Sequence, residues 1–387
     1  MRIALLAWES LHSIPVGGVG VHVTELAAAL ERKGHEVHVF TRMGPGQPHL
    51  ERIHGVWYHR CPFGFNPNFV DEIQNMCRSF VHHLFAAEDY MGAHFDVVHA
   101  HDWLTSNAMV WIKQGRGRRV ILTIHSTEYG RCGNNFWGGQ SARIRDHERH
   151  GTYCADRVIT VSKALKGEVM WMYNLPDWKV EVAYNGVNVH NFDGWIPDPG
   201  AIRKSYGIGP IDPMVLFSGR MTSQKGPDLL LEAVPMILRY YPRAKFVFAG
   251  EGDMRGACEH RARQMGVAHA CRFLGHRGGM ELHNLYKICD VVCVPSRNEP
   301  FGITILEAWS AGKPVVASKN GGPDEIVWHE VTGLKIYATP ESVAWGLGTL
   351  FTNFEWARWM GRNGRVAAEA AFSWDFVADR VLGAYAT

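Results

Sequence analysis

The chain of 387 residues lacks the patterns that mark several specialised classes of protein. Its eight cysteines are scattered without a CxxC pair, so we predict neither a zinc site nor a disulfide framework. The formal net charge of +2 gives no electrostatic reason to expect nucleic-acid binding. No apolar stretch approaches the roughly 20 residues that cross a bilayer, and the apolar run before Glu9 is too short for a signal peptide. We therefore expect a cytoplasmic protein with reduced thiols and no transmembrane segment.

The chain does contain a regular alternation of short apolar runs and longer amphipathic runs. Residues 2–7 form the first apolar run, residues 21–33 follow at helical spacing, and residues 36–41 form the next run. Gly34 stands where the end of a helix favours a residue with positive φ. A strand, a helix and a strand within about 40 residues predict a βαβ unit and hence a parallel sheet. Further strands of this series are expected at residues 96–99, 120–124, 157–161 and 180–183.

The pattern starts again after a stretch with many prolines and glycines at residues 190–212. The second series of strands is expected at residues 214–218, 245–249, 271–274, 291–295 and 314–317. Helices fit between these strands, for instance at residues 228–240 and 305–311, and residues 356–385 have a helical pattern. We therefore predict the α/β class with two Rossmann-like domains, residues 1–192 and 193–369, whose parallel sheets face a cleft between the domains.

A glycine-rich turn, PVGGVGVHVTEL, lies between the first expected strand and the first helix. Gly17, Gly18 and Gly20 let the backbone approach a ligand closely, and the start of a helix favours an anion. The spacing is not the GxGxxG of dinucleotide-binding enzymes, and no acidic residue ends the second strand. Two interpretations stay open, a phosphate-binding loop and a tight turn before a well-packed helix.

Histidines recur at the carboxyl ends of two strands in the first domain. In VVHAHDWLT, His99 lies within a strand, and His101 and Asp102 end it; in ILTIHSTEYGR, His125 follows the next strand. Ligands of open parallel sheets bind beyond the carboxyl ends of the strands. The alternatives are structural histidines and an aspartate that caps a helix. Repetition at the same topological place favours a functional site.

Two cations follow the first strand of the second domain, in LFSGRMTSQKG. Arg220 and Lys225 lie beside Gly219 and Gly226 near a helix start, an arrangement that can neutralise a diphosphate. The loop is not a Walker loop, because GxxxxGK[ST] is absent. The alternative is a solvated basic loop, although an arginine directly after an apolar strand is less typical of one.

Two glutamates occur in PSRNEPFGITILEAWSAGKPVVAS. Glu299 falls in a loop and Glu307 in the helix that follows, with Gly302 near the helix start. Exposed amides at such a start can hold an anion, and a carboxylate can accept two hydrogen bonds from a diol. Spacing alone leaves equally open a surface carboxylate and a carboxylate on the face of a helix.

Together these motifs resemble those of the retaining glycosyltransferases of the glycogen-synthase and sucrose-synthase-like superfamily, which have the two-domain GT-B fold. The most specific part is the pair of glutamates within EPFGITILE, with SGR and QKG before it and GKPVVAS and GGPDEIV after it. HAHDW and TIHSTEYG look most similar to glycogen and starch synthases. YNGVNVHNF resembles the family's segment before the linker, with Asn188 where aspartate is usual. The resemblance runs nearly end to end, and it implies that residues 370–387 form a helix that crosses back to the first domain.

The resemblance implies roles for residues of the second domain. Arg220 and Lys225 would bind the donor diphosphate and stabilise the leaving group, and Glu307 would hold the ribose hydroxyls. Glu299 would contact the donor sugar near its 3-hydroxyl. The sugar and phosphate would also be contacted by the segment Phe301, Gly302, Ile303 and Thr304.

Residues of the first domain would complete the site. The phosphates would be approached by the loop of Gly17, Gly18 and Gly20. His125 would meet the donor sugar, and Asp102 would lie near the reaction centre. The acceptor side is expected to hold His101, Asp102 and Tyr129.

Enzymes of this kind need no metal ion or other cofactor, which agrees with the lack of a DxD pair near these motifs. Negative charge would grow on the departing phosphate, and fixed arginine and lysine charges in a closed site would stabilise it. The double displacement of many retaining hydrolases needs a second carboxylate about 5 Å from an acid, and no pair of residues suggests one. We therefore predict attack on the same face of the sugar, with the leaving phosphate taking the acceptor's proton.

The expected reaction moves a hexosyl unit from ADP-glucose or UDP-glucose to an α-1,4-glucan. A lipid-linked or small-molecule acceptor is the alternative, and a non-catalytic nucleotide-sugar-binding protein is a second. A phosphorylase would be much longer, and UDP-sugar 2-epimerases lack this arrangement of arginine, lysine and glutamates. Aromatic residues within 62–83 and 130–150 either stack on a glucan or belong to the core. The sequence leaves open the nucleobase, the sugar and the oligomeric state.

Overall fold

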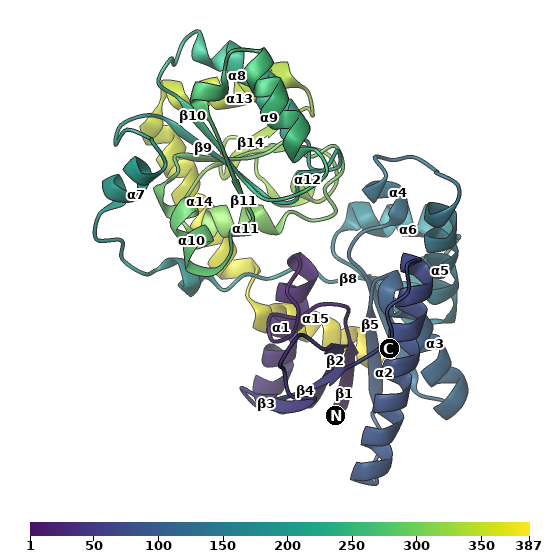
Figure 1. Cartoon of the computed structure of the whole chain (residues 1–387). Coiled ribbons are helices and arrows are strands. Elements are labelled where there is room, and N and C mark those ends of the chain that lie inside the picture. The colour runs from purple at the N-terminus through teal and green to yellow at the C-terminus, as the bar shows by residue number, and fades with distance from the viewer. The chain divides into compact units, whose positions relative to one another are not determined.

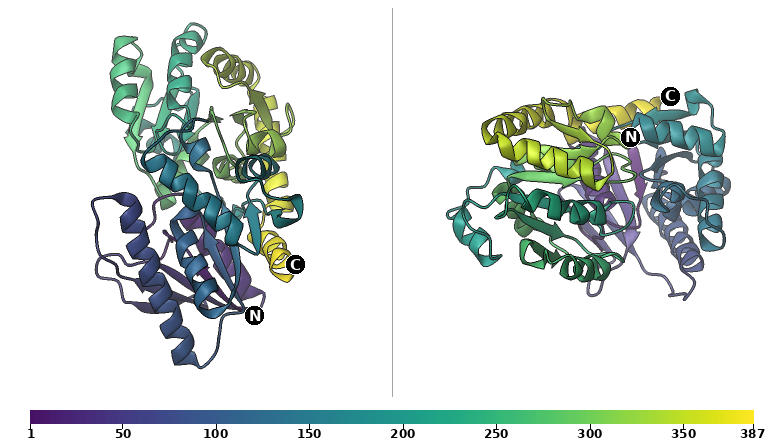
Figure 2. Two further views of the ribbon diagram at one scale, coloured as in Figure 1. Left: turned by 90° about the vertical axis from the view of Figure 1, so that its right-hand side faces the viewer. Right: turned by 90° about the horizontal axis from the view of Figure 1, so that it is seen from above.

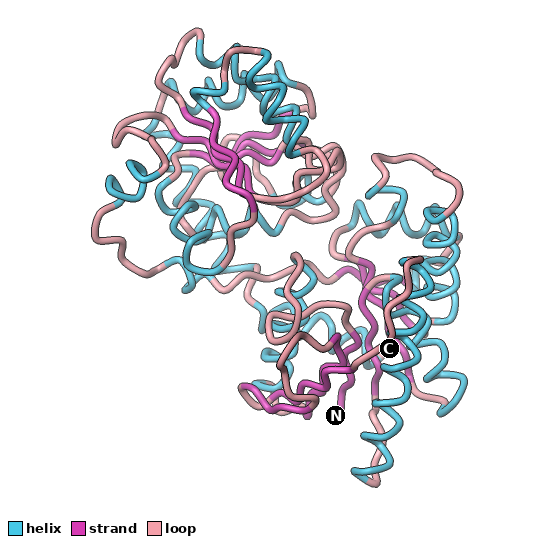
Figure 3. Tube along the Cα trace, in the orientation of Figure 1, coloured by secondary structure: helices cyan, strands magenta, loops and turns pink.

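The computed structural model describes all 387 residues, which divide into two compact units. The first unit contains Met1–Gly186 and Trp374–Thr387, and the second contains Val187–Ser373. The first junction thus lies at residues 186/187, whereas the boundary expected from the sequence is 192/193. In each unit the strands gather at the centre and the helices lie outside them (Figures 1 and 3).

The first unit has an eight-stranded sheet in the order β3-β4-β2-β1-β5-β6-β7-β8. Its strands are β1 (Arg2–Leu6), β2 (Glu36–Arg42), β3 (Leu50–Ile53), β4 (Val56–Cys61), β5 (Val97–His101), β6 (Arg119–Ile124), β7 (Arg157–Thr160) and β8 (Val180–Val182). All neighbours are parallel except β3 and β4, which form an antiparallel hairpin at one edge. The hairpin turns at His54 and Gly55, and both have the positive φ that a two-residue type I′ turn requires.

Helices cover both faces of this sheet (Figure 2). They are α1 (Gly18–Arg32), α2 (Phe69–Met91), α3 (Trp103–Arg116), α4 (Glu128–Arg131), α5 (Gln140–Cys154), α6 (Lys163–Tyr173), the short 3-10 helix η1 (Asp177–Lys179) and α15 (Trp374–Ala386). The helices α1 and α15 pack side by side on one face, while α2, α3 and α5 pack together on the other. The end of the chain therefore completes the core of the unit in which the chain begins (Figure 1).

The second unit has a six-stranded parallel sheet in the order β11-β10-β9-β12-β13-β14. Its strands are β9 (Met214–Ser218), β10 (Lys245–Ala249), β11 (Cys271–Gly275), β12 (Val291–Val294), β13 (Val315–Ser318) and β14 (Gly333–Ile336). Its helices are η2 (Val189–Phe192), α7 (Pro199–Ser205), α8 (Pro227–Leu238), α9 (Arg255–Gln264), η3 (Ala268–Ala270), α10 (Gly279–Ile288), α11 (Ile303–Ser310), α12 (Gly322–Ile326), α13 (Pro340–Thr352) and α14 (Phe354–Ala371). The helix α8 packs against α13, and α11 packs against α14.

The structure differs from the sequence-based expectation in two elements. The hairpin of β3 and β4 was not expected, and it adds an antiparallel strand to a sheet expected to be parallel. The helical pattern of residues 356–385 belongs to two helices, α14 and α15, which are separated by Phe372 and Ser373, and α15 is the last helix that the resemblance implies at residues 370–387. The break is where the chain passes from the second unit to the first. Gly34 has a φ of 84° just after α1, as expected. The longest helices, α2 and α14, are too polar to cross a bilayer, and no other helix qualifies.

Candidate functional site

The carboxyl ends of β5 and β6 bring three of the predicted residues together. His101 is the last residue of β5, Asp102 follows it, and His125 follows β6, its neighbour in the sheet. Oδ1 of Asp102 accepts a hydrogen bond from the backbone N–H of His125 at 2.7 Å, and Nδ1 of His101 lies 3.1 Å from Nε2 of His125. The side chain of Asp102 makes no cap of α3, and its φ of 59° is a conformation that an aspartate keeps only where its surroundings hold it. The carboxylate thus links two strand ends.

His99, in contrast, is a structural residue of the core. It is fully buried in β5, and its Nε2 lies 2.6 Å from the hydroxyl of Thr123. Its Nδ1 lies 2.7 Å from the hydroxyl of Tyr385 on α15. Both ring nitrogens therefore have a partner within the protein, as is usual for buried polar atoms.

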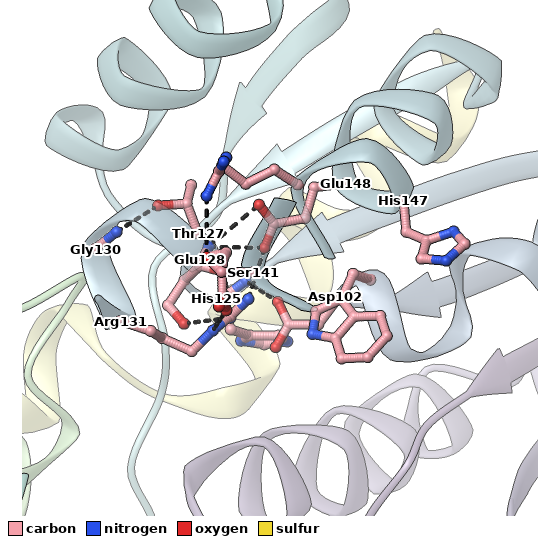
Figure 4. A network of polar contacts seen from close by, with 12 residues as sticks. Asp102, His125, Thr127, Glu128, Gly130, Arg131, Ser141, His147 and Glu148 are labelled. Carbon is pink, nitrogen blue, oxygen red and sulfur yellow. Dashed lines mark hydrogen bonds and ion pairs between the residues drawn. The ribbon is translucent and has the colours of Figure 1, made fainter. Parts of the chain in front are cut away.

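A buried ionic network holds the segment that follows His125 (Figure 4). The carboxylate of Glu148 on α5 is fully buried, and it accepts hydrogen bonds from the backbone N–H of Glu128 at 2.8 Å and from Arg131 at 2.6 Å. Arg131 also pairs with the side chain of Glu128 at 3.1 Å, and the hydroxyl of Tyr173 donates to Glu148. Burial raises the pKa of Glu148 to about 7, although Arg131 and Tyr173 oppose the shift. The network fixes the short helix α4, which carries Tyr129.

Tyr129 lies in an aromatic cluster that is open to solvent. Its ring centroid lies 4.8 Å from that of Phe136 and 5.7 Å from that of Trp171. Phe136 and Trp171 are 58% and 63% exposed, so these rings do not belong to the core. Within residues 62–83, Phe80 is fully buried and belongs to the core, whereas Phe65 is 81% exposed and does not.

The glycine-rich turn folds around a buried carboxylate, that of Glu9. The backbone N–H groups of Val16 and Gly17 both donate to this carboxylate, at 2.8 Å for Val16. A Cβ atom at Gly20 would come within 3.3 Å of Glu9 Oε2, so a larger residue there would press on the carboxylate. Burial raises the pKa of Glu9, and the two amides oppose the shift. Gly18 and Gly20 form the first turn of α1, which has no side-chain cap.

In the second unit, the two predicted cations have different surroundings. Arg220 follows β9, is exposed and makes no ion pair. Nζ of Lys225 lies 2.8 Å from each carboxylate oxygen of Glu299, and the hydroxyl of Ser296 donates to the same carboxylate at 2.9 Å. Glu299 is only 4% exposed. Two residues predicted to act on the same donor thus contact each other directly.

The loop that carries Glu299 is held by the later segment GGPDEI. The backbone N–H of Glu299 donates to the carbonyl of Asn320 at 3.0 Å, and that of Gly322 donates to the carbonyl of Glu299 at 2.8 Å. A Cβ atom at Gly321 would lie 2.3 Å from the carbonyl oxygen of Glu299, and one at Gly322 would lie 2.4 Å from the Cα of Phe301. Neither position accepts a side chain without moving the loop. Phe301 itself is buried, so its backbone is the part that remains for a ligand.

The helix α11 begins at the end of this loop. Gly302 precedes the helix with a φ of 102°, and no side chain caps the first turn, where Ile303 and Thr304 are partly exposed. Glu307 follows Ile303 by one turn on the same face. Its Oε2 accepts a hydrogen bond from the hydroxyl of Tyr286 on α10 at 2.6 Å. Burial raises the pKa of Glu307 to about 7, and the tyrosine hydroxyl opposes the shift.

Several residues of these two groups were not expected from the sequence, among them Glu9, Ser296, Tyr286, Glu148 and the bonded pair His22 and Asn185. Each is a polar side chain that is buried or faces a buried partner. Burial of a single polar residue leaves no periodic signal. The only available sign was the position of Glu9 before the glycine turn and of Asn185 in YNGVNVHNF.

Both halves of the chain match known families of proteins. Residues 16–191 match the family described as Glycosyltransferase Family 4, and residues 199–367 match the family described as Glycosyl transferases group 1. An uncharacterized glycosyltransferase of Methanocaldococcus jannaschii is 40% identical over 390 residues, which cover 100% of this chain and 98% of that protein. The glycogen synthase of Mycobacterium tuberculosis is 30% identical over 360 residues, with coverages of 89% and 84%. The D-inositol 3-phosphate glycosyltransferase of Actinosynnema mirum is 30% identical over 422 residues, with coverages of 99% and 96%.

Solved structures share the fold over the whole chain. Sucrose-phosphate synthase of Thermosynechococcus elongatus superposes with a TM-score of 0.84 at 24% identity, covering 100% of this chain and 98% of that one. The catalytic domain of starch synthase IV of Arabidopsis thaliana, bound to ADP and acarbose, gives a TM-score of 0.79 at 18% identity, with coverages of 100% and 98%. These likenesses confirm the GT-B fold that the motifs implied.

Proposed function

Since the chain belongs to the family 4, group 1 glycosyltransferases, we propose that it transfers a glucosyl unit, with retention of configuration, from ADP-glucose or UDP-glucose to the hydroxyl of an α-1,4-glucan. The proposal rests above all on the second unit. There, Arg220 follows the carboxyl end of β9, and Glu299 and the uncapped start of α11 follow the carboxyl end of β12, the neighbouring strand. Lys225, in the loop after β9, forms an ion pair with Glu299. Cations, helix amides and carboxylates are the groups that a diphosphate and a sugar require.

The donor contacts follow from the chemistry of each group. Arg220 has no partner in the protein, so its guanidinium is available to the diphosphate. The first-turn amides of α11 add the positive end of a helix dipole. Glu307, one turn further, would accept hydrogen bonds from the two ribose hydroxyls. Because these residues supply the positive charge themselves, we propose that transfer needs no metal ion.

The mechanism depends on Lys225. The ammonium is already held by Glu299, so it costs little reorganisation when charge grows on the leaving phosphate. The acceptor attacks the face that the phosphate leaves, and the departing phosphate takes the acceptor's proton. We expect Lys225→Ala to lose most turnover while donor binding weakens less. The matched control is Lys335→Ala, which removes a lysine of the same unit with the same side-chain exposure, paired at 3.0 Å with the exposed carboxylate of Asp324. Near-normal turnover of Lys225→Ala would refute this role.

The glucan acceptor is supported by the first unit. The partly exposed ring of Tyr129 and the exposed rings of Phe136 and Trp171 offer flat apolar faces on which sugar rings can stack. The relative that is a glycogen synthase supports the same acceptor. A small-molecule acceptor is the second candidate, because the D-inositol 3-phosphate glycosyltransferase matches at the same identity over nearly its whole length.

Nucleotide release from ADP-, UDP- and GDP-sugars, measured with and without glycogen or maltooligosaccharides, tests the proposal. Glycogen-dependent release from one glucose donor is expected. Release that no glucan accelerates but inositol phosphate does would favour the second candidate. No release from any donor, even slow hydrolysis without acceptor, would indicate a non-catalytic binding protein.

A pair of tryptophan variants then tests the acceptor surface. Trp171→Ala should raise the KM for glucan and leave the KM for the donor unchanged. Trp178→Ala, which removes an equally exposed ring outside the cluster, should change neither. Equal changes in the KM for glucan in the two variants would refute the proposal that the cluster of Tyr129, Phe136 and Trp171 binds the glucan.

A further inference from the structure

Three histidines from different elements meet in the first unit. His22 lies on α1, His101 ends β5 and His125 follows β6. The ring centroid of His22 lies 4.5 Å from that of His125 and 5.4 Å from that of His101. One ring nitrogen of each residue lies within 4.8 Å of a ring nitrogen of both others. Because the three residues are far apart in the chain, no ligand spacing in the sequence indicates this cluster.

The hydrogen bonds of His22 leave one nitrogen with a free lone pair. Its Nδ1 lies 2.7 Å from Oδ1 of Asn185. An amide oxygen only accepts hydrogen bonds, so the proton of this neutral ring is on Nδ1 and the lone pair is on Nε2. That Nε2 is buried and has no hydrogen-bond partner, and the same holds for Nε2 of His101. The residues are only 2% and 1% exposed.

Such unpaired nitrogens are not a general property of the buried histidines here. His99 stacks on His101 with 4.4 Å between ring centroids, yet both of its nitrogens have partners. Buried polar atoms without partners are uncommon, and each one costs the fold stability. Nε2 of His101 carries a lone pair when its Nδ1–H donates to Nε2 of His125, a contact of 3.1 Å that a bound ion would replace. Two such nitrogens in one cluster of metal-ligating side chains suit a ligand that accepts lone pairs.

We propose that His22, His101 and His125 form a binding site for a divalent transition-metal ion of the zinc type. Neutral imidazole is a preferred ligand of Zn²⁺ and Co²⁺. Zn–N bonds of about 2.0–2.1 Å in a tetrahedral site bring the nitrogens to about 3.3 Å from one another. The ring nitrogens lie within 4.8 Å of one another, so they need to move closer together to reach that geometry. The bond from Asn185 to Nδ1 of His22 is the kind of outer contact that fixes a metal-ligating histidine.

The electrostatic surroundings suit a cation. Asp102 bonds the backbone of His125, and its negative charge lies near that of Glu9. His125 is partly exposed, which gives an ion in solution access and leaves a fourth position for water.

A bound ion would inhibit the enzyme rather than assist it, a consequence that rests on the proposed function. The family resemblance implies that His125 meets the donor sugar. An ion that takes its lone pair would compete with the nucleotide-sugar. The free concentration of zinc would then set the apparent KM for the donor.

Direct metal binding tests the site without reference to activity. The sulfur of Cys154 lies 3.8 Å from the ring of His150, so these two residues form a second pair of potential metal ligands. All samples of the full chain would therefore carry His150→Ala to remove that pair. Titration with Co²⁺ should give one equivalent of tightly bound ion with the visible absorption of a tetrahedral nitrogen site. Zn²⁺ should displace it. Absence of a one-to-one site would overturn the proposal.

Variants of the cluster locate the ion. His22→Ala should weaken Co²⁺ binding at least tenfold, and Asn185→Ala about tenfold through the outer contact. The exposed His260→Ala should leave binding unchanged. If His22→Ala does not fold, His125→Ala, whose ring is partly exposed, replaces it. Equal affinity of cluster variants and control would overturn the assignment.

Inhibition is then measured as the donor KM at buffered free zinc concentrations. Zinc should raise the donor KM with little change in kcat, and His22→Ala should weaken this effect at least tenfold. A donor KM that stays constant while the site is filled would overturn the competition. If no donor is turned over, the proposed function fails while the cobalt titration still decides the metal site.

Discussion

The ionisation of Glu307 should control donor binding under the proposed function, and Tyr286 should control where that ionisation takes place. Burial raises the pKa of Glu307 to about 7, against the opposing hydrogen bond from the hydroxyl of Tyr286 at 2.6 Å. The ionised carboxylate accepts hydrogen bonds from both ribose hydroxyls more strongly than the protonated acid, because protonation turns one of its oxygens into a donor. The donor KM should therefore fall as the pH rises through about 7.

The variant Tyr286→Phe removes the hydrogen bond and keeps the ring. A hydrogen bond to a charged group contributes about 1.5–3 kcal/mol, and one pKa unit corresponds to about 1.4 kcal/mol. Because Glu307 is partly exposed, we take the lower end, a rise of about one unit. At pH 7 the ionised fraction of Glu307 then falls from about a half to about a tenth. The donor KM of Tyr286→Phe should be about fivefold higher at pH 7 and approach the wild-type value at about pH 9.

The assay is nucleotide release at several donor concentrations across the pH range. Tyr241→Phe is the matched control, since it removes a tyrosine hydroxyl of the same unit that bonds only Thr352 and a backbone carbonyl. Glu307→Gln should lose this pH dependence. If the midpoint of the pH dependence of the donor KM is the same in Tyr286→Phe as in wild type, or lies at lower pH, the proposed role of the Tyr286 hydroxyl is refuted.

The same shift predicts a dependence of stability on pH that needs no substrate. The pKa of Glu307 is higher in the folded protein than its value of 4.5 in a model peptide. Its contribution to stability is therefore fully present below about pH 4.5 and is lost as the pH rises through about 7. The loss is at most about 3 kcal/mol. Glu307→Gln should stabilise the protein at pH 8 relative to wild type and change it less at pH 5, as read from thermal unfolding.

Three further predictions concern the stability of the folded protein. Lys225→Ala should cost about 2–3 kcal/mol of stability, because it leaves the buried carboxylate of Glu299 without its cation. Adding Glu299→Gln should restore part of this loss, and a further loss would contradict the ion pair's role. Gly361→Ala should destabilise the protein by at least about 1–3 kcal/mol, because its Cβ would lie 2.1 Å from a backbone oxygen. The control Gly348→Ala has open space around its Cβ and should be neutral or stabilising. Thermal unfolding of the two variants measures the difference. Trp374→Ala should cost about 3–5 kcal/mol in chemical unfolding, and a loss below about 1 kcal/mol would show that α15 does not depend on this ring.

The parts of the fold that could be predicted are those in which the sequence pattern is local. The strands β9 and β10 were expected at the residues where they occur, because strands buried on both faces give continuous apolar runs. The strand β3 has the sequence LERI and is mostly exposed, so neither alternation nor an apolar run marks it. The break between α14 and α15 falls at Phe372 and Ser373, without a proline or glycine to announce it.

The candidate site shows the same division. That Asp102 and His125 follow strands could be predicted from apolar runs, and a parallel sheet brings such positions to one edge. Their contacts could not be predicted, because Lys225 and Glu299 are 74 residues apart in the chain. The same applies to His22 and Asn185, which are 163 residues apart. Contacts of this kind depend on the registration of whole elements rather than on any motif.

The two cations of the second unit should act at different stages, because only one is free. Arg220 is exposed without an ion pair, so it can meet the diphosphate before any contact in the protein is broken. Lys225 shares its charge with Glu299, a carboxylate that is 4% exposed and also bonded by Ser296. A diphosphate that draws on Lys225 weakens its hold on Glu299, and a sugar hydroxyl can then donate to that carboxylate. A nucleoside diphosphate without the sugar also draws on Lys225, but it offers no hydroxyl that donates to the carboxylate of Glu299 in return. We therefore expect Arg220→Ala to weaken binding of the nucleotide and of the nucleotide-sugar alike, and Glu299→Gln to weaken mainly the nucleotide-sugar. Calorimetry with both ligands distinguishes these patterns, and equal losses for Glu299→Gln would refute the division of roles.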